Sequence, residues 1–242
     1  MCTVSFIKHK EGFSLTSNRD EQASRPTDAP EVYEENHQQL VYPKDQKAGG
    51  TWIATSNQNV SVCLLNGAFE NHKRQLPYAR SRGQVLKERF AYYTNRDFIK
   101  QVDLYNVEPF TLLLIDHNND LDFMELIWDG QQKHTRQIDT SENHIWASAT
   151  LYSEQERENR KQWFKKFLDQ NKTIKTDDII DFHTGSFTDD KANDMLMQRN
   201  AELKTLSVSQ INILPNSTSF IYKDLDQKKS YNLNLDMLCK TV

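Results

Sequence analysis

The sequence has no long apolar run and no excess of positive charge, and each absence excludes a class of protein. The longest apolar run, Leu112–Ile115, is far shorter than the ~20 residues that a membrane-spanning helix needs. The net charge of −4 argues against a nucleic-acid partner, which requires a basic surface. The N-terminus lacks the apolar block of a secretory signal, because Lys8, His9 and Lys10 come too early.

Cysteine is also scarce, with only Cys2, Cys63 and Cys239 in the chain. An odd number at wide spacing is neither a disulfide framework nor a zinc pattern. This usage favours a cytoplasmic, reducing compartment. The G-x-G-x-x-G fingerprint, the phosphate loop and the G-x-S-x-G elbow are all absent. We therefore expect no resident cofactor and a small-molecule ligand or substrate, and the sequence indicates nothing about the oligomeric state.

The composition is polar but still that of a folded chain. Hydrophobic residues make up 37% of the 242 residues, below the usual share of roughly 45–50%. The 12 Phe, 9 Tyr and 4 Trp are enough to form a core. No stretch has the composition of a linker, so we predict a single domain over residues 1–242.

Short β-type runs open the chain. The ranges 3–7 and 13–17 predict a first hairpin, and 51–55 and 60–65 predict a second. The polar stretch 22–47 is either a functional excursion or contains a short strand near Leu40.

Helices and further strands follow. Apolar spacings of three and four predict a helix over 80–93, Ser153 and Glu156 predict a capping box, and Thr176 predicts the N-cap of a later helix. Hairpin blocks separated by helices favour an α+β protein with antiparallel sheets covered by helices. Further strands are predicted at 110–116, 121–128, 133–138, 144–148, 206–214, 217–222 and 230–235.

Cys2 can become a reactive N-terminal cysteine because it is the second residue of the chain. Methionine aminopeptidases remove Met1 when the second residue is small, which would leave a cysteine with both a thiol and a free α-amine. The amine titrates near ~8 and the thiol near ~8.5, so the amine can act as base toward its own thiol. A second-position cysteine can equally be an accident of sequence.

The charged tetrapeptide Asn18-Arg19-Asp20-Glu21 ends the strand predicted next to Cys2. Arginine can lower the pKa of a thiol, and aspartate can orient an amine. Neighbouring strand residues point to opposite faces, so Arg19 and Asp20 cannot both reach Cys2 from a regular strand. Either the strand ends or bulges there, or only one of them belongs to a site. The alternative is a solvated turn.

Five segments between residues 1 and 66 together resemble the NRDE family, which includes the transport and Golgi organisation proteins. That family is similar in turn to the cysteine-type N-terminal-nucleophile (Ntn) hydrolases, among them bile-salt hydrolases and penicillin V acylases. The resemblance implies an αββα sandwich of antiparallel sheets. It rests on Met1-Cys2-Thr3, Thr16-Ser17-Asn18-Arg19-Asp20-Glu21, Ser24-Arg25-Pro26, Ala48-Gly49-Gly50-Thr51-Trp52-Ile53-Ala54 and Cys63-Leu64-Leu65-Asn66.

The resemblance also implies roles for single residues. Cys2 would be the nucleophile, with Arg19 beside its thiolate and Asp20 near the α-amine. Glu21 competes with Asp20 for that role, and Asn18 and Glu21 are candidates for substrate binding. Asn66 would supply an oxyanion-hole or substrate-binding amide, or it simply belongs to a turn with Gly67. Cys63 is expected to be an inert buried thiol, and Trp52 a core residue.

Two places depart from the hydrolase pattern. The chain has no asparagine near Ala149 and no arginine near Leu206, although Lys204 could substitute for the latter. Losing an oxyanion donor typically lowers the rate about 100- to 1000-fold. The function expected is a cysteine amidohydrolase, or an acyltransferase, acting on a small non-peptide amide. The alternative is a non-catalytic haem-binding or haem-trafficking protein, although no haem-attachment motif is present and His72 and His183 are expected to be surface residues.

Overall fold

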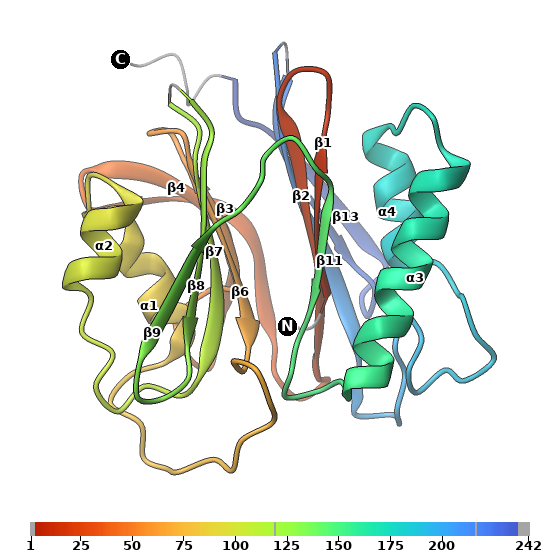
Figure 1. Cartoon of the computed structure of the whole chain (residues 1–242), viewed down its shortest axis with the longest axis horizontal. Helices are drawn as coiled ribbons and strands as arrows, with labels where there is room; N and C mark the ends of the chain where they lie inside the picture. Colours follow the sequence, from red (N-terminus) through yellow and green to blue (C-terminus); the bar gives the residue numbers. More distant parts are fainter. Residues whose placement is uncertain (1–2, 119, 216, 237–242) are drawn as a thin grey trace. The chain divides into compact units, whose positions relative to one another are not determined.

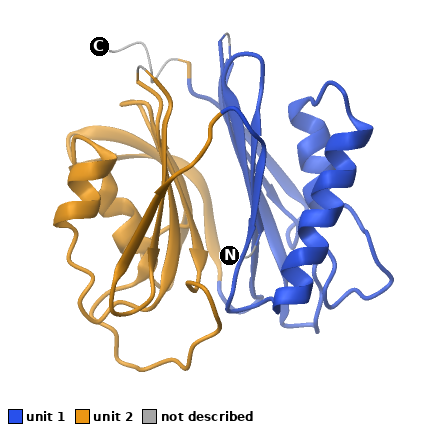
Figure 2. Cartoon of the chain, in the orientation of Figure 1, with its two compact units in different colours: residues 1–25, 141–235 blue, residues 26–140, 236–242 orange. Residues whose placement is uncertain are grey.

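A computed structural model describes residues 3–118, 120–215 and 217–236, which divide into two compact units (Figure 2). Of the described residues, unit 1 contains 3–25 and 141–235, and unit 2 contains 26–140 and Asp236. Unit 2 is therefore inserted between two segments of unit 1. The single domain expected over residues 1–242 stays a prediction.

Unit 1 is built on a six-stranded antiparallel sheet with the order β10-β1-β2-β11-β12-β13. The first hairpin forms as expected, and its second strand extends five residues beyond the expected end, through the charged tetrapeptide. The strands are β1 (Thr3–Lys8), β2 (Phe13–Gln22), β10 (His144–Ala147), β11 (Leu203–Leu214), β12 (Ser217–Asp224) and β13 (Lys229–Asn234).

Two helices, α3 (Glu154–Gln170) and α4 (Thr176–Thr184), lie side by side against this sheet (Figure 1). The predicted capping box begins α3, since Ser153 Oγ accepts from the Glu156 amide at 3.3 Å and Glu156 accepts from the Ser153 amide at 2.6 Å. Their apolar faces pack on β1 through a cluster made of Ile7, Phe164, Phe167, Ile179, Phe182 and Met195.

The cap predicted for α4 is wrong by one residue. Lys175 is the N-cap, and Thr176 is the first helical residue. The carboxylate of Asp178 accepts a hydrogen bond from the Lys175 backbone amide at 2.8 Å. The third residue of the helix thus satisfies the amide of the N-cap residue itself, as in a capping box.

Unit 2 has a seven-stranded antiparallel sheet in which the strands follow one another in chain order. Its central strand β7 is buried along Leu112–Ile115, as expected of a strand covered on both faces. The strands are β3 (Thr27–Glu35), β4 (Gln38–Asp45), β5 (Ile53–Ser56), β6 (Val60–Asn66), β7 (Phe110–Asp116), β8 (Asp122–Trp128) and β9 (Lys133–Gln137).

The stretch 22–47 holds two strands, β3 and β4, where the sequence indicated one at most. Pro30 obscured the pattern. It lies where the β3–β4 register shifts between Asp28 and Glu31, and β3 is an edge strand. A bulge on an edge strand tolerates a residue without an amide hydrogen, because no ladder bond is lost there.

The helix expected over 80–93 is interrupted. Helix α1 (Arg82–Glu88) tightens into a 3₁₀ turn over Arg89–Ala91, and α2 (Asn95–Gln101) follows. The buried Arg89 side chain donates to the Tyr92 carbonyl at 2.8 Å, which holds the chain in the turn. Gly83 at the start of α1 touches the backbone of Gly50 and Thr51, so closely that a Cβ there would lie 2.7 Å from the Thr51 oxygen.

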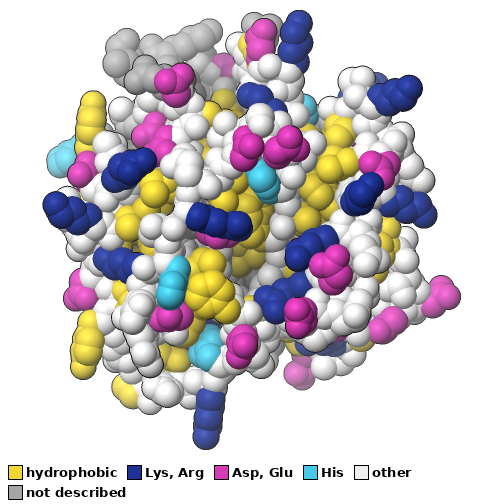
Figure 3. All heavy atoms as spheres, viewed as in Figure 1, with side chains coloured by type: hydrophobic (Ala, Val, Ile, Leu, Met, Phe, Trp, Pro, Cys, Tyr) yellow, Lys and Arg dark blue, Asp and Glu magenta, His cyan; other side chains and the backbone are white. Residues whose placement is uncertain are grey.

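The described surface carries no single-sign patch on the face drawn in Figure 3, where basic and acidic side chains are interspersed. None of the helices in the described ranges combines the length and apolarity that crossing a bilayer requires.

Candidate active site

Strand β2 presents the charged tetrapeptide beside the start of β1. The ladder pairs Thr3 with Asn18 and Val4 with Ser17. Paired residues share a face of the sheet, and residues two apart along a strand share it as well. Asp20 therefore belongs to the face of Thr3, whereas Arg19 belongs to the face of Val4.

The irregularity expected at this point exists, but it lies in the neighbouring strand. The register between β2 and β11 shifts between Thr205, the partner of Asp20, and Ser207, the partner of Arg19. Leu206 is the extra residue of this bulge. The strand β2 itself continues to Gln22, so Arg19 and Asp20 stay on opposite faces.

Asn18 is committed to the scaffold of unit 1. Its side-chain amide donates to the carbonyls of His183 at 3.0 Å and Met195 at 3.1 Å, and its oxygen contacts His183 Nδ1. His183 Nε2 in turn lies 2.7 Å from the hydroxyl of Ser5. Asn18, His183 and Ser5 are fully buried. These contacts fix β1, β2 and α4 relative to one another, and they occupy the donors and the oxygen of Asn18.

Burial lowers the pKa of His183 to about 3, so its ring is neutral. The sequence led us to expect a surface histidine here, and that expectation is wrong. A fully buried ring whose two nitrogens contact Ser5 and Asn18 cannot serve as a haem ligand without breaking this network. The other candidate, His72, has its Nε2 3.3 Å from Glu108.

Asp20 is 3% exposed and is held by two hydroxyl groups. Tyr152 donates to Oδ2 at 2.6 Å, and Thr205 donates to Oδ1 at 2.5 Å. The ring of Tyr152 lies 3.5 Å from the guanidinium carbon of the buried Arg160, which donates to Thr3 Oγ1 at 3.2 Å.

Arg19 lies on a polar face of the sheet. It is 2% exposed, and its Nη2 donates to the carbonyl of Arg25 at 3.2 Å. The register places Ser209 between Ser17 and Tyr222, so hydroxyl groups from three strands share this face. Burial raises the pKa of Tyr222, against the opposing effects of the Ser207 hydroxyl and the Arg19 charge.

Glu21 is the least buried of the four. Burial would raise the pKa of its carboxyl, but the Gln22 amide and the charges of Arg25 and Arg19 act against burial and the pKa is lowered. Arg25 Nη1 lies 3.2 Å from Glu21 Oε2. Glu21 is therefore an ionised partner of Arg25 at the end of β2.

Of the remaining predicted residues, two lie outside the described ranges and three belong to unit 2. Cys2 and Cys239 lie outside the described residues. Asn66 ends β6 in unit 2, pairs with Phe110, and precedes Gly67, whose φ is +83°. Cys63 and Trp52 are buried, as expected.

The segment near Ala149, where the hydrolase pattern has an asparagine, follows strand β10, which pairs with the start of β1. Ala147 pairs with Thr3, and Ser148 comes directly after it. Ser148 is 1% exposed, and its hydroxyl lies 3.0 Å from that of Thr150. Lys204, considered as a substitute for the missing arginine, places its Nζ 2.6 Å from Asp226. No group of three or more His, Cys, Asp or Glu in the described ranges could hold a metal ion.

Solved structures with the same architecture are proteins of the Ntn-hydrolase fold. A variant of the conjugated bile acid hydrolase from Clostridium perfringens is 7% identical, with a TM-score of 0.64 over 98% of this chain and 94% of that one. A Caenorhabditis elegans N-acylethanolamine-hydrolyzing acid amidase ortholog is 9% identical, with a TM-score of 0.62 over 96% and 100%. Penicillin V acylase from Agrobacterium tumefaciens is 8% identical, with a TM-score of 0.59 over 100% and 89%.

These likenesses define the chain as a protein of the Ntn-hydrolase fold, which confirms the expected α+β class with its antiparallel sheets. No curated protein matches it in sequence. The family model for Transport and Golgi organisation 2 matches residues 1–232, so the chain belongs to that family. The predicted family is thereby confirmed.

Proposed function

We propose that this protein is a cysteine amidohydrolase that cleaves a small, linear, non-peptide amide, with Cys2 as the nucleophile after removal of Met1. The observation that carries the proposal is the pair Arg19 and Asp20 on opposite faces of β2, next to the first described residue of β1. Cys2 is bonded to Thr3, whose partner is Asn18. Asn18 is in turn bonded to Arg19, so the described partner of Thr3 is the residue that precedes this pair.

A regular strand lets only one of these two residues reach the Cys2 side chain. We assign that role to Arg19, and we assign Asp20 to the α-amine, which is a main-chain group. Arg19, on the face of Val4, stabilises the thiolate and keeps it reactive at neutral pH. Asp20, held by Tyr152 and Thr205, orients the α-amine of Cys2 as the base. The rigid hydroxyl partners suit this role, because a base must be oriented as well as near. Glu21 is the weaker candidate because Arg25 already neutralises it.

The reaction follows from these assignments. The thiolate attacks the amide carbonyl, and the α-amine, having taken the thiol proton, returns it to the leaving nitrogen. The C–N bond breaks as the thioester forms, and water then hydrolyses the thioester to release the acid. The oxyanion of each tetrahedral intermediate needs donors, and within unit 1 we assign this role to the buried hydroxyl of Ser148 in place of the missing asparagine.

The likeness in fold supports the reaction class without fixing the substrate. The three solved structures are named for conjugated bile acids, N-acylethanolamines and penicillin V. All of these names describe an acyl group joined to a small amine-bearing partner. A panel of such acyl-amides is therefore the rational substrate set for this chain.

Hydrolysis of that panel by the purified, Met1-processed protein tests the proposal. Intact mass spectrometry first establishes that Met1 has been removed, since a retained methionine blocks the α-amine and contradicts the mechanism. Cys2→Ala should abolish turnover, whereas Cys63→Ala, at a buried thiol, should retain it in folded protein. Turnover that survives Cys2→Ala would refute the assignment.

Thiol reactivity provides a second test that needs no substrate. Cys2 should react with iodoacetamide at neutral pH faster than Cys63, and Arg19→Leu should slow that reaction by about ten-fold through loss of thiolate. The matched control is Arg25→Leu, which removes the partner of Glu21 and leaves Arg19 in place. Equal slowing in both variants would show a general charge effect and remove Arg19 from the site. If turnover is absent and haem titration instead gives a saturable Soret change, the haem-binding alternative replaces this proposal.

A further inference from the structure

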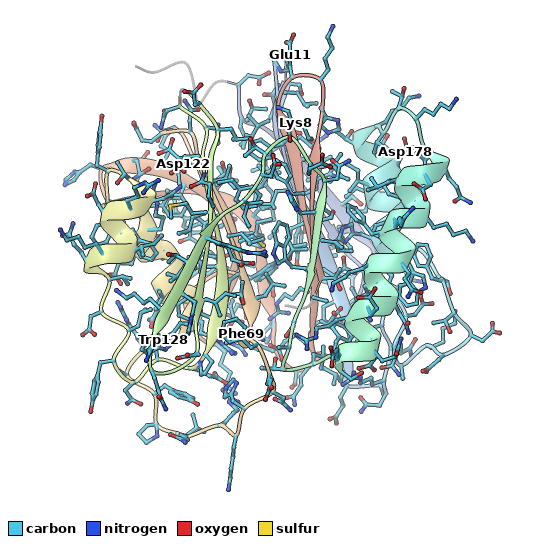
Figure 4. The ribbon with its side chains drawn as sticks, in the orientation of Figure 1. Lys8, Glu11, Phe69, Asp122, Trp128 and Asp178 are labelled. Carbon is cyan, nitrogen blue, oxygen red and sulfur yellow. The ribbon has the colours of Figure 1, made fainter. Side chains whose placement is uncertain are left out.

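Unit 2 contains a cavity that none of the proposed catalytic residues lines. It measures about 650 Å³, within the range of small-molecule sites. The walls come from the start of β4, the 3₁₀ turn after α1, the end of β7 and the start of β8. Figure 4 labels Asp122 and Trp128 at the two ends of β8, and the cavity lies at the Asp122 end.

Two polar atoms in this wall are buried without a hydrogen-bond partner among the described residues. One is a donor, Nη2 of Arg89, and the other is an acceptor, Oε1 of Gln38. Such atoms are rare in folded proteins, because a buried polar group without a partner is destabilising. A donor and an acceptor left over in one cavity indicate a ligand that can accept and donate at once.

The surroundings of Arg89 are rigid. Its Nε donates to Asn95 Oδ1 at 2.7 Å and its Nη1 to the Tyr92 carbonyl at 2.8 Å. Asn95 in turn donates to Asp122 Oδ2 at 3.1 Å. Only Nη2 is left over, 3.7 Å from Asp116 Oδ2, which is too far for a hydrogen bond. The guanidinium is thus fixed on two sides, and Nη2 is its nitrogen without a hydrogen-bond partner among the described residues.

Gln38 is fixed in the same way. Its Nε2 donates to the carbonyl of Phe90, in the 3₁₀ turn. That contact settles which end of the amide is nitrogen, because a carbonyl can only accept. The oxygen of Gln38 is therefore the unpaired acceptor.

The charges of the wall select among ligand classes. One arginine faces three aspartates, Asp116, Asp120 and Asp122. This excess of negative charge disfavours phosphates and carboxylates. A simple amine would suit the aspartates but would be repelled by Arg89 and leave its nitrogen unpaired. A hydroxyl group satisfies both kinds of neighbour, because it donates one hydrogen bond and accepts others.

An aromatic ring completes the site. Tyr93 lines the cavity and is 94% exposed. An exposed ring beside polar groups offers a flat apolar surface to a ligand with an apolar face. We propose that this cavity binds a neutral saccharide, whose hydroxyls pair with Arg89, Gln38 and the aspartates while its ring packs on Tyr93.

Saturation-transfer difference NMR on the full chain tests this site directly. The probes are glucose, galactose, mannose, maltose and lactose, with glucose 6-phosphate and putrescine as the anionic and cationic comparisons. We expect at least one neutral sugar to bind with a dissociation constant on the order of 1 mM, and both charged probes to bind at least several-fold more weakly. No binding by any neutral sugar, or equal binding by a charged probe, overturns the proposal.

Paired variants place the binding in this cavity. Gln38→Leu should weaken sugar binding by about ten-fold, while the adjacent Gln39→Leu should leave it unchanged, because Gln39 pairs with Glu34 outside the cavity. Tyr93→Ala should also weaken binding, and Tyr105→Ala, at a ring 83% exposed elsewhere, should not. If Gln38→Leu does not fold, Tyr93→Ala decides, since its exposed ring contributes little to stability. Wild-type affinity in both cavity variants overturns the proposal.

Discussion

The sheet of unit 1 buries more polar side chains than the sheet of unit 2, although both also bury apolar ones. In unit 2, Leu112, Leu113, Leu114 and Ile115 of β7 are fully buried in succession. In unit 1, the strands bury polar groups at no more than 2% exposure: Thr3, Ser5, Ser14, Thr16, Ser17, Asn18, Ser207, Ser209, Gln210 and Asn212. Apolar burial is non-directional, whereas each buried polar group must find a partner at a set distance and angle.

The polar interior of unit 1 is a connected network. Ser14 donates to Asn212 Oδ1 at 2.6 Å, Asn212 donates to Gln210 Oε1 at 3.1 Å, and Gln210 donates to Thr16 Oγ1 at 3.0 Å. These bonds join β2 to β11 in one register. A sheet that carries catalytic groups gains from this kind of interior, because a shift of one residue would leave several groups unpaired at once.

Reciprocal substitutions should give the largest effects. Leu113→Asn in unit 2 should lower the free energy of unfolding by about 4 kcal/mol, since it removes apolar burial and adds an unpaired amide. Asn18→Leu in unit 1 should lower it by about 3 kcal/mol, because the carbonyls of His183 and Met195 and the His183 ring lose their partner. Urea denaturation at pH 7.5 measures both. An Asn18→Leu variant as stable as the wild type would mean that the polar network does not hold unit 1 together.

Acid should have the next largest effect, and it should act on both interiors through one buried histidine in each. The pKa of His183 falls from its ordinary value of 6.5 to about 3 because the ring is buried. Below pH 6.5 the unfolded chain therefore binds a proton that the folded chain does not, so stability falls as the pH drops from 6.5 toward 3. Between pH 7.5 and 5.0 this residue should contribute a loss of about 2 kcal/mol.

His183→Gln should remove that part of the pH dependence, as measured by urea denaturation at the two pH values. His117 in unit 2 is the matched comparison, since burial lowers its pKa to about 4. The variant His117→Gln should remove a similar part. A His183→Gln variant with the full wild-type dependence would show that the ring is charged in the folded protein.

The helix caps should give the smallest and most even effects. Ser153 of unit 1 and Ser81 of unit 2 each form a capping box. Ser153→Ala and Ser81→Ala should each lower the free energy of unfolding by about 1 kcal/mol. A cap acts within one turn of its helix, so the side chains buried in the neighbouring sheet should not change the size of this loss. A several-fold difference between the two variants would show that the units respond differently even to a local change.

Local patterns in the sequence predicted much of this structure. The first hairpin, the Ser153 capping box and the strand over Phe110–Asp116 follow from neighbouring residues whose spacing reports their surroundings. The tetrapeptide at 18–21 could be singled out for the same reason. The strand β3 was missed because its bulge at Pro30 breaks the alternation on which such predictions depend.

The partners of the candidate site could not be predicted in this way. Tyr152 and Thr205 reach Asp20 from 132 and 185 residues away. Nothing in the sequence near either residue marks it as a carboxylate ligand. His183 lacked a signal as well, since only the packing of α4 against β1 and β2 turns a helical histidine into a buried one. Long-range contacts of this kind follow from topology, which a local pattern does not contain.

The insertion of unit 2 into unit 1 has a consequence for biosynthesis. All strands of unit 2 lie in residues 26–140, whereas β1 and β2 pair with β10 and β11, from Thr3 to Ala147 and from Gln22 to Leu203. At about 5–20 residues per second, the ribosome finishes the strands of unit 2 several seconds before β11, the second partner of β2, exists. During that interval the hairpin that carries Arg19 and Asp20 has an open edge along β2. A chaperone bound to the nascent chain would therefore find its natural target in the first 25 residues.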